Sequence, residues 1–206
     1  MAIGRLHVIT DTRPGRDALA VTTAAVEAGA PVVQVRGKAL TDRELYELTC
    51  RLLDVCAAHN ATCIVDDRVH VAVGAGAHGA HVGEHDLPVA VARRLLGPEL
   101  ALGATARDPE TARAHAAAGA TYLGVGPAFR TKTKDGLPEP LGPKGIGLVA
   151  AAVEIPVIAI AGVTADRVAD LVAAGAHGVA VIGAISDAAD PYLATEQLLR
   201  ALEKSA

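Results

Sequence analysis

The sequence has almost no aromatic side chains: tryptophan is absent, and Phe, Trp and Tyr together make up 2% of the 206 residues. Hydrophobic residues nevertheless account for 51% of the chain, so alanine, valine, leucine and isoleucine must fill the interior. Small side chains of this kind favour close packing of helices against a sheet. We expect one domain, residues 1–206, because two ordinary domains with a linker need a longer chain.

Excess positive charge and long apolar runs are also lacking. The formal net charge is −4, which argues against nucleic acid as a partner, because such binders present a basic surface to phosphates. No apolar run approaches the roughly 20 residues of a membrane-spanning helix, and the N-terminus shows no cationic leader with a cleavage site. We therefore expect a cytoplasmic protein without a membrane partner.

Cysteine is scarce, and its spacing excludes the usual cysteine chemistry. Cys50, Cys56 and Cys63 are odd in number and lack the close pairs of zinc or redox motifs. We expect all three to be reduced and to serve in packing.

Apolar, β-branched runs alternate with alanine-rich helical segments along the whole chain. Such alternation predicts parallel strands, because each helix must carry the chain back across the sheet before the next strand begins. Eight units favour an α/β fold of one TIM (β/α)8 barrel over an open doubly wound sheet, whose glycine fingerprint is missing after the first strand. The predicted strands cover residues 6–10, 32–36, 62–66, 80–83, 101–105, 121–126, 156–161 and 178–182.

An Ala-Gly-Ala triplet recurs four times, each time between a helical segment and a strand. Glycine there predicts a left-handed residue that ends the helix. The triplets follow every second helix, so the chain divides into four related quarters, which suits a closed barrel. The central glycines are Gly29, Gly76, Gly119 and Gly175.

Polar residues follow most of the predicted strands. The carboxyl ends of barrel strands meet at one rim, where the chemistry of such folds gathers. Charged groups there lose hydration unless a ligand or an opposite charge meets them, so the clustering predicts a binding site. The candidates are Gln34, Arg36, Lys38, Asp66, Asp67, Arg68, Glu84, His85, Asp86, Thr105 and Arg107.

The segment after the sixth strand has the composition of an anion-binding loop. Its hydroxyl and ammonium groups suit phosphate oxygens, although a solvated surface turn with two lysines is the alternative. Glycines after the last two strands, Gly162 and Gly183, offer backbone N–H groups, as in the phosphate sites of such barrels. The loop residues are Thr131, Lys132, Thr133 and Lys134.

Cations and carboxylates at this rim together suit a magnesium-bound pyrophosphate. Carboxylates such as Asp67 and Asp86 are hard ligands for the divalent ion, while Arg36, Lys38 and Lys134 can hold the phosphoryl oxygens. The pattern therefore predicts two anionic groups, one bound through metal and one through backbone.

Taken in order, these segments resemble the motif series of the thiamine phosphate synthase family, whose wider superfamily includes the thiazole tautomerases. The resemblance covers nearly the whole chain. It is carried by Gln-Val-Arg-Gly-Lys at 34–38, Asp-Asp-Arg at 66–68, Gly-Glu-His-Asp at 83–86, Gly-Pro at 126–127 with Thr-Lys-Thr-Lys at 131–134, Ala-Ile-Ala-Gly at 159–162 and Val-Ile-Gly-Ala-Ile at 181–185.

The resemblance implies a TIM-barrel transferase that joins hydroxymethylpyrimidine pyrophosphate to a thiazole phosphate, releases pyrophosphate with Mg²⁺, and forms homo-oligomers. By position it implies that the pyrimidine pyrophosphate is held by Gln34, Val35, Arg36, Gly37, Lys38 and Lys134, with Asp66 and Thr105 beside it. It implies Asp67 and Asp86 as Mg²⁺ ligands. Around the thiazole phosphate it implies Thr131, Lys132, Thr133, Gly162, Ile182 and Gly183. Catalysis would consist of stabilising the departing charge through Arg36, Lys38, Thr105 and Lys134.

Four positions depart from the family pattern. Asp66 stands in place of the usual Asn, Thr105 and Gly183 in place of Ser, and Arg107 near a common His. A thiazole tautomerase is one alternative, but it needs a general base, and an arginine, which stays protonated, cannot supply one. A non-catalytic protein that binds thiazole phosphate is another.

A third alternative is a transition-metal site formed by His78, His81 and His85 with the acidic residues beside them. Successive side chains on a strand point to opposite faces, so we do not expect the three histidines to converge.

Overall fold

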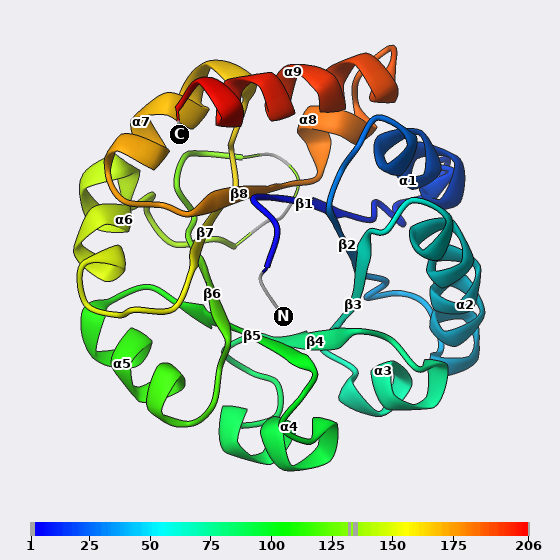
Figure 1. The fold of residues 1–206 in the computed structure, drawn as a ribbon, viewed down its shortest axis with the longest axis horizontal. Coiled ribbons are helices and arrows are strands. Elements are labelled where there is room, and N and C mark those ends of the chain that lie inside the picture. The colour runs from blue at the N-terminus through cyan, green and yellow to red at the C-terminus, as the bar shows by residue number, and fades with distance from the viewer. Residues whose placement is uncertain (1–2, 132, 134–135, 206) are drawn as a thin grey trace.

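The structure, a computed structural model, describes residues 3–131, 133 and 136–205. Eight parallel strands form a closed barrel in sequence order, and helices surround it as an outer ring (Figure 1). This arrangement confirms the predicted TIM barrel. The strands are β1 (Leu6–Ile9), β2 (Val32–Val35), β3 (Thr62–Asp66), β4 (Gly79–Val82), β5 (Ala101–Ala106), β6 (Tyr122–Val125), β7 (Val157–Ile160) and β8 (Gly178–Val181).

Helices connect successive strands around the ring, and a last helix follows a short one after β8 (Figure 1). They are α1 (Ala18–Glu27), α2 (Asp42–Ala58), α3 (Val69–Ala75), α4 (Val89–Leu96), α5 (Pro109–Ala117), α6 (Gly142–Ala150), α7 (Val168–Ala173), α8 (Gly183–Ser186) and α9 (Pro191–Lys204), with a 3-10 turn, η1 (Ala165–Arg167), before α7.

Seven of the eight strands differ from the predicted ranges by one residue at one or both ends. The predicted strand 80–83 in fact runs from Gly79 to Val82, so Gly79 lies inside the strand and not before it. A Cβ at Gly79 would collide with the backbone of Ala101 on β5. Only glycine permits this close approach of two strands, so a residue typical of turns lies inside the sheet.

The Ala-Gly-Ala triplets end helices as predicted. Their central glycines Gly29, Gly76, Gly119 and Gly175 have φ angles of 100°, 69°, 102° and 109°. Gly76 is the first residue after α3, and the other three are the second residue after α1, α5 or α7. Positive φ angles disfavour residues with a side chain at these positions.

The strands alternate between two cores. Their outward side chains, such as Val33, Val65 and Leu123, pack against the helices in a continuous apolar layer. Their inward side chains form a smaller cluster inside the barrel, which consists of Ile3, Ile9, Val32, Ile64, Tyr122, Ile158 and Ala180. Ile3 comes from the segment before β1, which crosses the barrel opening in Figure 1 and closes its floor.

Inward glycines make room for the two large rings of the barrel interior. A Cβ at Gly103 on β5 would overlap the Tyr122 ring and the His81 Nδ1 atom, and a Cβ at Gly124 would lie 2.9 Å from His81 Cε1. With so few aromatic residues, the barrel centre is filled by one tyrosine and the histidines beside it.

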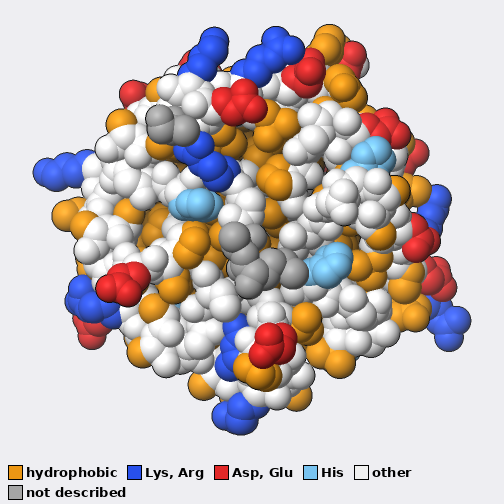
Figure 2. Space-filling view, viewed as in Figure 1, with side chains coloured by type: hydrophobic (Ala, Val, Ile, Leu, Met, Phe, Trp, Pro, Cys, Tyr) orange, Lys and Arg blue, Asp and Glu red, His pale blue; other side chains and the backbone are white. Residues whose placement is uncertain are grey.

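Figure 2 views the molecule from the same side as Figure 1 and shows acidic and basic side chains interspersed around the periphery. Within the described residues, no helix is long and apolar enough to cross a membrane.

The crowding at Gly103 generates a stability prediction. Gly103→Ala should lower the free energy of unfolding by about 1–3 kcal/mol, because overpacking forces the Tyr122 and His81 rings apart. Gly74→Ala on α3 is a matched control, since a Cβ there meets nothing within 4 Å. Urea denaturation should show the control at wild-type stability or slightly above it; equal stability of both variants would contradict the packing argument.

Candidate active site

Three residues predicted to bind substrate form a hydrogen-bonded group at the ends of β2 and β3. Gln34 Nε2 donates to Asp66 Oδ1 at 2.6 Å, and Arg36 Nε lies 3.5 Å from Asp66 Oδ2. Burial raises the pKa of Asp66, while the charges of Arg36 and Lys38 oppose this shift. Asp66, which stands where the family usually has Asn, therefore places its carboxylate next to the Arg36 guanidinium.

The two predicted magnesium ligands lie close together beside a lysine. Lys38 Nζ forms a close ion pair with Asp67 Oδ2. Burial raises the pKa of Asp86, and a hydrogen bond with Asp67 and the charge of that carboxyl raise it further. Asp67 and Asp86 thus share one small region at the ends of β3 and β4, where two negative charges lie against a single ammonium.

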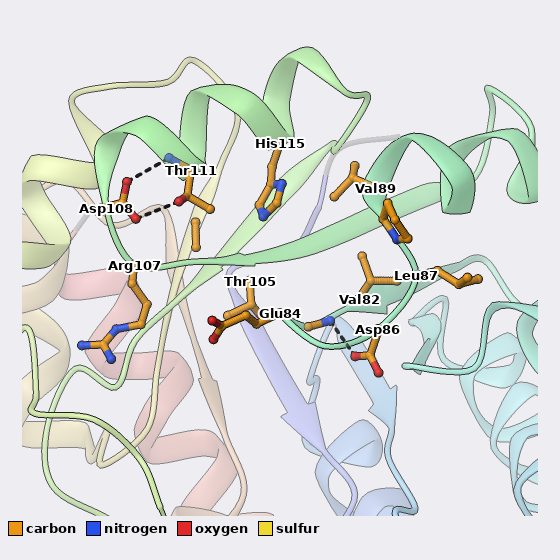
Figure 3. A pocket seen from close by; sticks show the side chains of 13 residues that line it. Val82, Glu84, Asp86, Leu87, Val89, Thr105, Arg107, Asp108, Thr111 and His115 are labelled. Carbon is orange, nitrogen blue, oxygen red and sulfur yellow. Dashed lines mark hydrogen bonds between the residues drawn. The ribbon is translucent and has the colours of Figure 1, made fainter.

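The backbone holds both carboxylates in place. Asp67 has a left-handed backbone with φ of 61°, and its N–H donates to the His81 carbonyl of β4 at 2.8 Å. Gly83 N donates to Asp86 Oδ2 at 2.8 Å (Figure 3). A left-handed non-glycine residue is uncommon and is often found at functional sites.

A polar column leads from the rim into the barrel. His81 Nε2 lies 3.0 Å from Thr105 Oγ1, and His81 Nδ1 lies 3.1 Å from the Tyr122 hydroxyl. The His7 ring meets the edge of Tyr122 with centroids 5.2 Å apart. Burial lowers the pKa of His81 to about 4 and that of His7 to about 3, so both rings are neutral at physiological pH. The column gives the Thr105 hydroxyl a fixed neutral partner.

The predicted phosphate-binding residues meet across the ends of β6, β7 and β8. Thr133 N donates to Thr131 Oγ1 at 3.2 Å, and Thr133 Oγ1 lies 3.2 Å from where a Cβ of Gly183 would stand. Gly162, with φ of 66°, has room for no Cβ because the Phe129 and Arg130 carbonyls lie beside it. Ile182 is half-buried against the interior cluster, so its backbone is the part that can meet a ligand.

At two of the predicted substrate-binding positions the structure shows a packing role. Val35 points outward into the core between sheet and helices and is fully buried, so only its backbone can serve the site. A Cβ at Gly37 would collide with Leu40, which makes this glycine a packing requirement. Lys132 and Lys134 lie outside the described residues.

A pocket of about 460 Å³ opens beside Asp86 and Thr105, between the ends of β4 and β5 and helices α4 and α5. In Figure 3, His115 and Thr111 approach it from α5, while Arg107 points away from His115. Arg107 Nη2 donates to the Glu139 carbonyl at 2.9 Å, which ties the end of β5 to the loop before α6.

The alternative metal site is not formed. Among the described residues, no group of three or more His, Cys, Asp or Glu side chains could hold a metal ion. His78 Nδ1 instead accepts from Cys63 N at 2.9 Å, and His81 belongs to the polar column. Cys50, Cys56 and Cys63 form no disulfide, and Cys56 and Cys63 are buried as expected.

Residues 6–185 match the family described as thiamine monophosphate synthase. The chain belongs to this family. It is 56% identical over 204 residues to a thiamine-phosphate synthase of Salinispora arenicola, with 98% of each chain covered. A thiamine-phosphate synthase of Moorella thermoacetica is 42% identical over 195 residues, which cover 94% of this chain and 93% of that relative.

Among solved structures, a thiamine phosphate pyrophosphorylase from Pyrococcus furiosus has a TM-score of 0.89 at 35% identity, covering 98% of this chain and 96% of that one. The family resemblance expected from the motifs is therefore confirmed, and so is membership of an enzyme class, the transferases.

One ionic cluster at the same rim was not predicted from the sequence. Asp11, which follows β1, accepts hydrogen bonds from Arg13 and from Ser186 Oγ of α8. The local signal was present, because Asp11 is a carboxylate near the end of an apolar strand just as Asp66 is. Its partner Ser186 is 175 residues away, and no short motif could reveal that contact.

The buried histidines generate a pH prediction. A histidine in the unfolded chain titrates near 6.5, so between this pH and the folded value of about 3 the unfolded state binds more protons than folded His7. On acidification from about pH 6.5, the wild-type free energy of unfolding should fall more steeply than that of His7→Gln, by up to ~1.4 kcal/mol per pH unit.

Asp66 and Asp86, whose pKa values are raised, act in the opposite direction in both proteins and cancel in the comparison. Chemical denaturation at pH 7, 6, 5 and 4.5 measures the difference, and parallel curves would contradict a neutral buried His7.

Proposed function

We propose that this protein is a thiamine phosphate synthase that joins hydroxymethylpyrimidine pyrophosphate to a thiazole phosphate and depends on Mg²⁺. Family membership supports the overall reaction. The observation that carries the residue assignments is the convergence of Lys38, Asp67 and Asp86 beside the Arg36–Asp66 pair at three adjacent strand ends.

The pyrophosphate would bind at the ends of β2 to β4. Arg36, Lys38 and the Gln34 amide are donors that suit phosphoryl oxygens, and each now rests against an aspartate. Their fixed positions mean that little reorganisation is needed when negative charge builds up on the leaving group. By family position Lys134 joins them as a fourth donor, from outside the described residues.

The residues present fit a magnesium ion. Asp67 lies close enough to Asp86 to disfavour the charged form of the Asp86 carboxyl, and a hard divalent cation would relieve this repulsion. Two carboxylates leave coordination positions for water and pyrophosphate oxygens, as is usual for Mg²⁺. When bound, the ion would neutralise charge on the departing pyrophosphate.

The thiazole phosphate would bind on the other side of the rim. The Thr131 and Thr133 hydroxyls and the backbone at Gly162, Ile182 and Gly183 supply neutral hydrogen-bond donors there. Lys132 joins them by family position.

The chemistry then needs few functional groups. The C–O bond to the pyrimidine methylene breaks, and its electron pair leaves with pyrophosphate. The electron-rich pyrimidine stabilises the resulting cation, and the lone pair of the thiazole nitrogen forms the new C–N bond. No proton is removed in this step, so no general base is required, which agrees with the neutral, hydrogen-bonded state of His81 below Thr105.

The experiment that tests this function is direct. The protein is incubated with the pyrimidine pyrophosphate, the thiazole phosphate and Mg²⁺, and thiamine phosphate is measured. Binding of the thiazole phosphate without product would favour a non-catalytic protein. Isomerisation of the thiazole alone would favour a tautomerase. That reaction needs a general base, which the Arg107 guanidinium cannot supply.

The magnesium assignment yields a mutational prediction. Asp67→Ala and Asp86→Ala should each lower Mg²⁺-dependent product formation by about 100-fold or more, because the departing charge loses its metal. Glu47→Gln is the control, since Glu47 is an exposed carboxylate on helix α2. Circular dichroism should show intact folds, and Mn²⁺ titration should show weaker binding in the two aspartate variants only. Full activity in both aspartate variants would eliminate the metal role.

The aspartate at position 66, where the family usually has Asn, yields a second mutational prediction. Asp66→Asn keeps the shape and the contact with Gln34 but frees Arg36 from its ion pair. The KM for the pyrimidine pyrophosphate should fall about fivefold, while the KM for the thiazole phosphate stays unchanged. An increase in the first KM would mean that the Asp66 carboxylate itself serves the substrate.

A further inference from the structure

An ionic cluster joins the ends of β1 and β8 beside the proposed phosphate site. It consists of Asp11, Arg13, Arg16, Ser186 and Asp187, and we call it the β1–β8 cluster. Neither the family motifs nor the proposed reaction assigns these residues a role. The cluster contains two guanidinium groups and two carboxylates, and the two halves differ in burial.

The first half is a rigid support. The Asp11 side chain is 3% exposed and accepts from Arg13 Nε at 2.8 Å, Arg13 Nη2 at 2.6 Å and Ser186 Oγ at 2.8 Å. Hydrogen bonds from Arg13 hold the pKa of Asp11 at about 2. Arg13 therefore forms a bidentate ion pair with the buried Asp11 carboxylate. If Arg13 moved away, the Asp11 charge would be left buried without a cation.

The second half is open to exchange. The Asp187 side chain is 50% exposed and forms a close ion pair with Arg16 Nη2, and Arg13 Nη2 lies 3.4 Å from it. Arg16 has no comparable buried partner: its Nη1 donates to the Ser186 carbonyl at 2.9 Å, and its Nε lies 3.7 Å from Asp11.

Asp187 places a negative charge next to residues proposed to receive a phosphate. Its Oδ2 lies 2.8 Å from where a Cβ of Gly183 would stand, and Thr133 Oγ1 lies 3.2 Å from the same point. A serine at position 183, usual in the family, would push the Asp187 carboxylate aside. Glycine and Asp187 therefore fit together in this chain.

We propose that Asp187 is an internal competitor for the thiazole phosphate, and that Arg16 is a binding residue which exchanges the Asp187 carboxylate for the phosphoryl group. This inference rests on the proposed function and deepens it. Two anions cannot share the space beside Gly183 without repulsion, so the carboxylate must turn toward solvent when phosphate arrives. Arg16 then pairs with the phosphate, while Arg13 and Asp11 stay in place.

The sign of the expected effect separates this role from a structural one. Asp187→Asn should lower the KM for the thiazole phosphate about fivefold and leave the KM for the pyrimidine pyrophosphate unchanged. Arg16→Ala should raise the KM for the thiazole phosphate by a similar factor. Asp54→Asn, the same charge change on the exposed face of α2, is the control and should change neither constant.

A double variant tests the exchange itself. If Arg16 is the group released, Asp187→Asn should give little further change in the Arg16→Ala background. A thiazole phosphate KM that is unchanged or raised in Asp187→Asn, or a change confined to thermal stability, would overturn the inference.

Calorimetric titration of the thiazole phosphate into the same variants keeps the two proposals apart. If wild type makes no thiamine phosphate, the proposed function fails. Tighter binding of the thiazole phosphate by Asp187→Asn than by wild type would still support the exchange, and equal or weaker binding would reject it.

Discussion

The arrangement of the rim depends on one constraint: a carboxylate that loses its water needs a donor or a cation against it. Asp66 has Gln34 and Arg36, Asp67 has Lys38, and Asp11 has Arg13. The pairs are internal to the protein, so the cations proposed to bind substrate are already in contact with anions of the chain. Under the proposed function, an anionic substrate would therefore exchange partners at this rim, and its affinity would be the difference between two electrostatic interactions.

The barrel beneath the rim satisfies the same constraint with neutral groups. A sequence poor in aromatic residues fills the interior with aliphatic side chains, and inward glycines leave space for Tyr122 and His81. Their hydrogen bonds end at Thr105, so neutral rings lie beneath the Thr105 side of the proposed pyrimidine site.

The fold and the clustering of charged side chains at the ends of β2, β3 and β4 could be predicted from the sequence, for physical reasons. Alternation and the helix-ending glycines are local patterns, and closure of the barrel brings consecutive strand ends together, so Arg36, Lys38, Asp67 and Asp86 meet because β2, β3 and β4 are neighbours. What escaped prediction lacks a local pattern. The outward direction of Val35, the position of Gly79 within a strand and the contact of Asp11 with Ser186 depend on packing or on segments distant in sequence.

In the proposed reaction, the two ends of the rim face different electrostatic tasks. At β2 to β4, charge on the leaving group increases during the reaction, so fixed cations and a metal lower the barrier. At β6 to β8, the thiazole phosphate keeps its charge throughout, and binding it more tightly would lower its KM without accelerating the chemical step. The proposed donors there are neutral hydroxyl and backbone groups, Lys132 by family position, and an Arg16 whose charge is offset by the competing Asp187 carboxylate; this moderate set suits a site that product must leave after each turnover. A rim with strong, unopposed cations at both ends would retain thiamine phosphate. In the proposed exchange, Arg16 pairs with Asp187 again when the product departs.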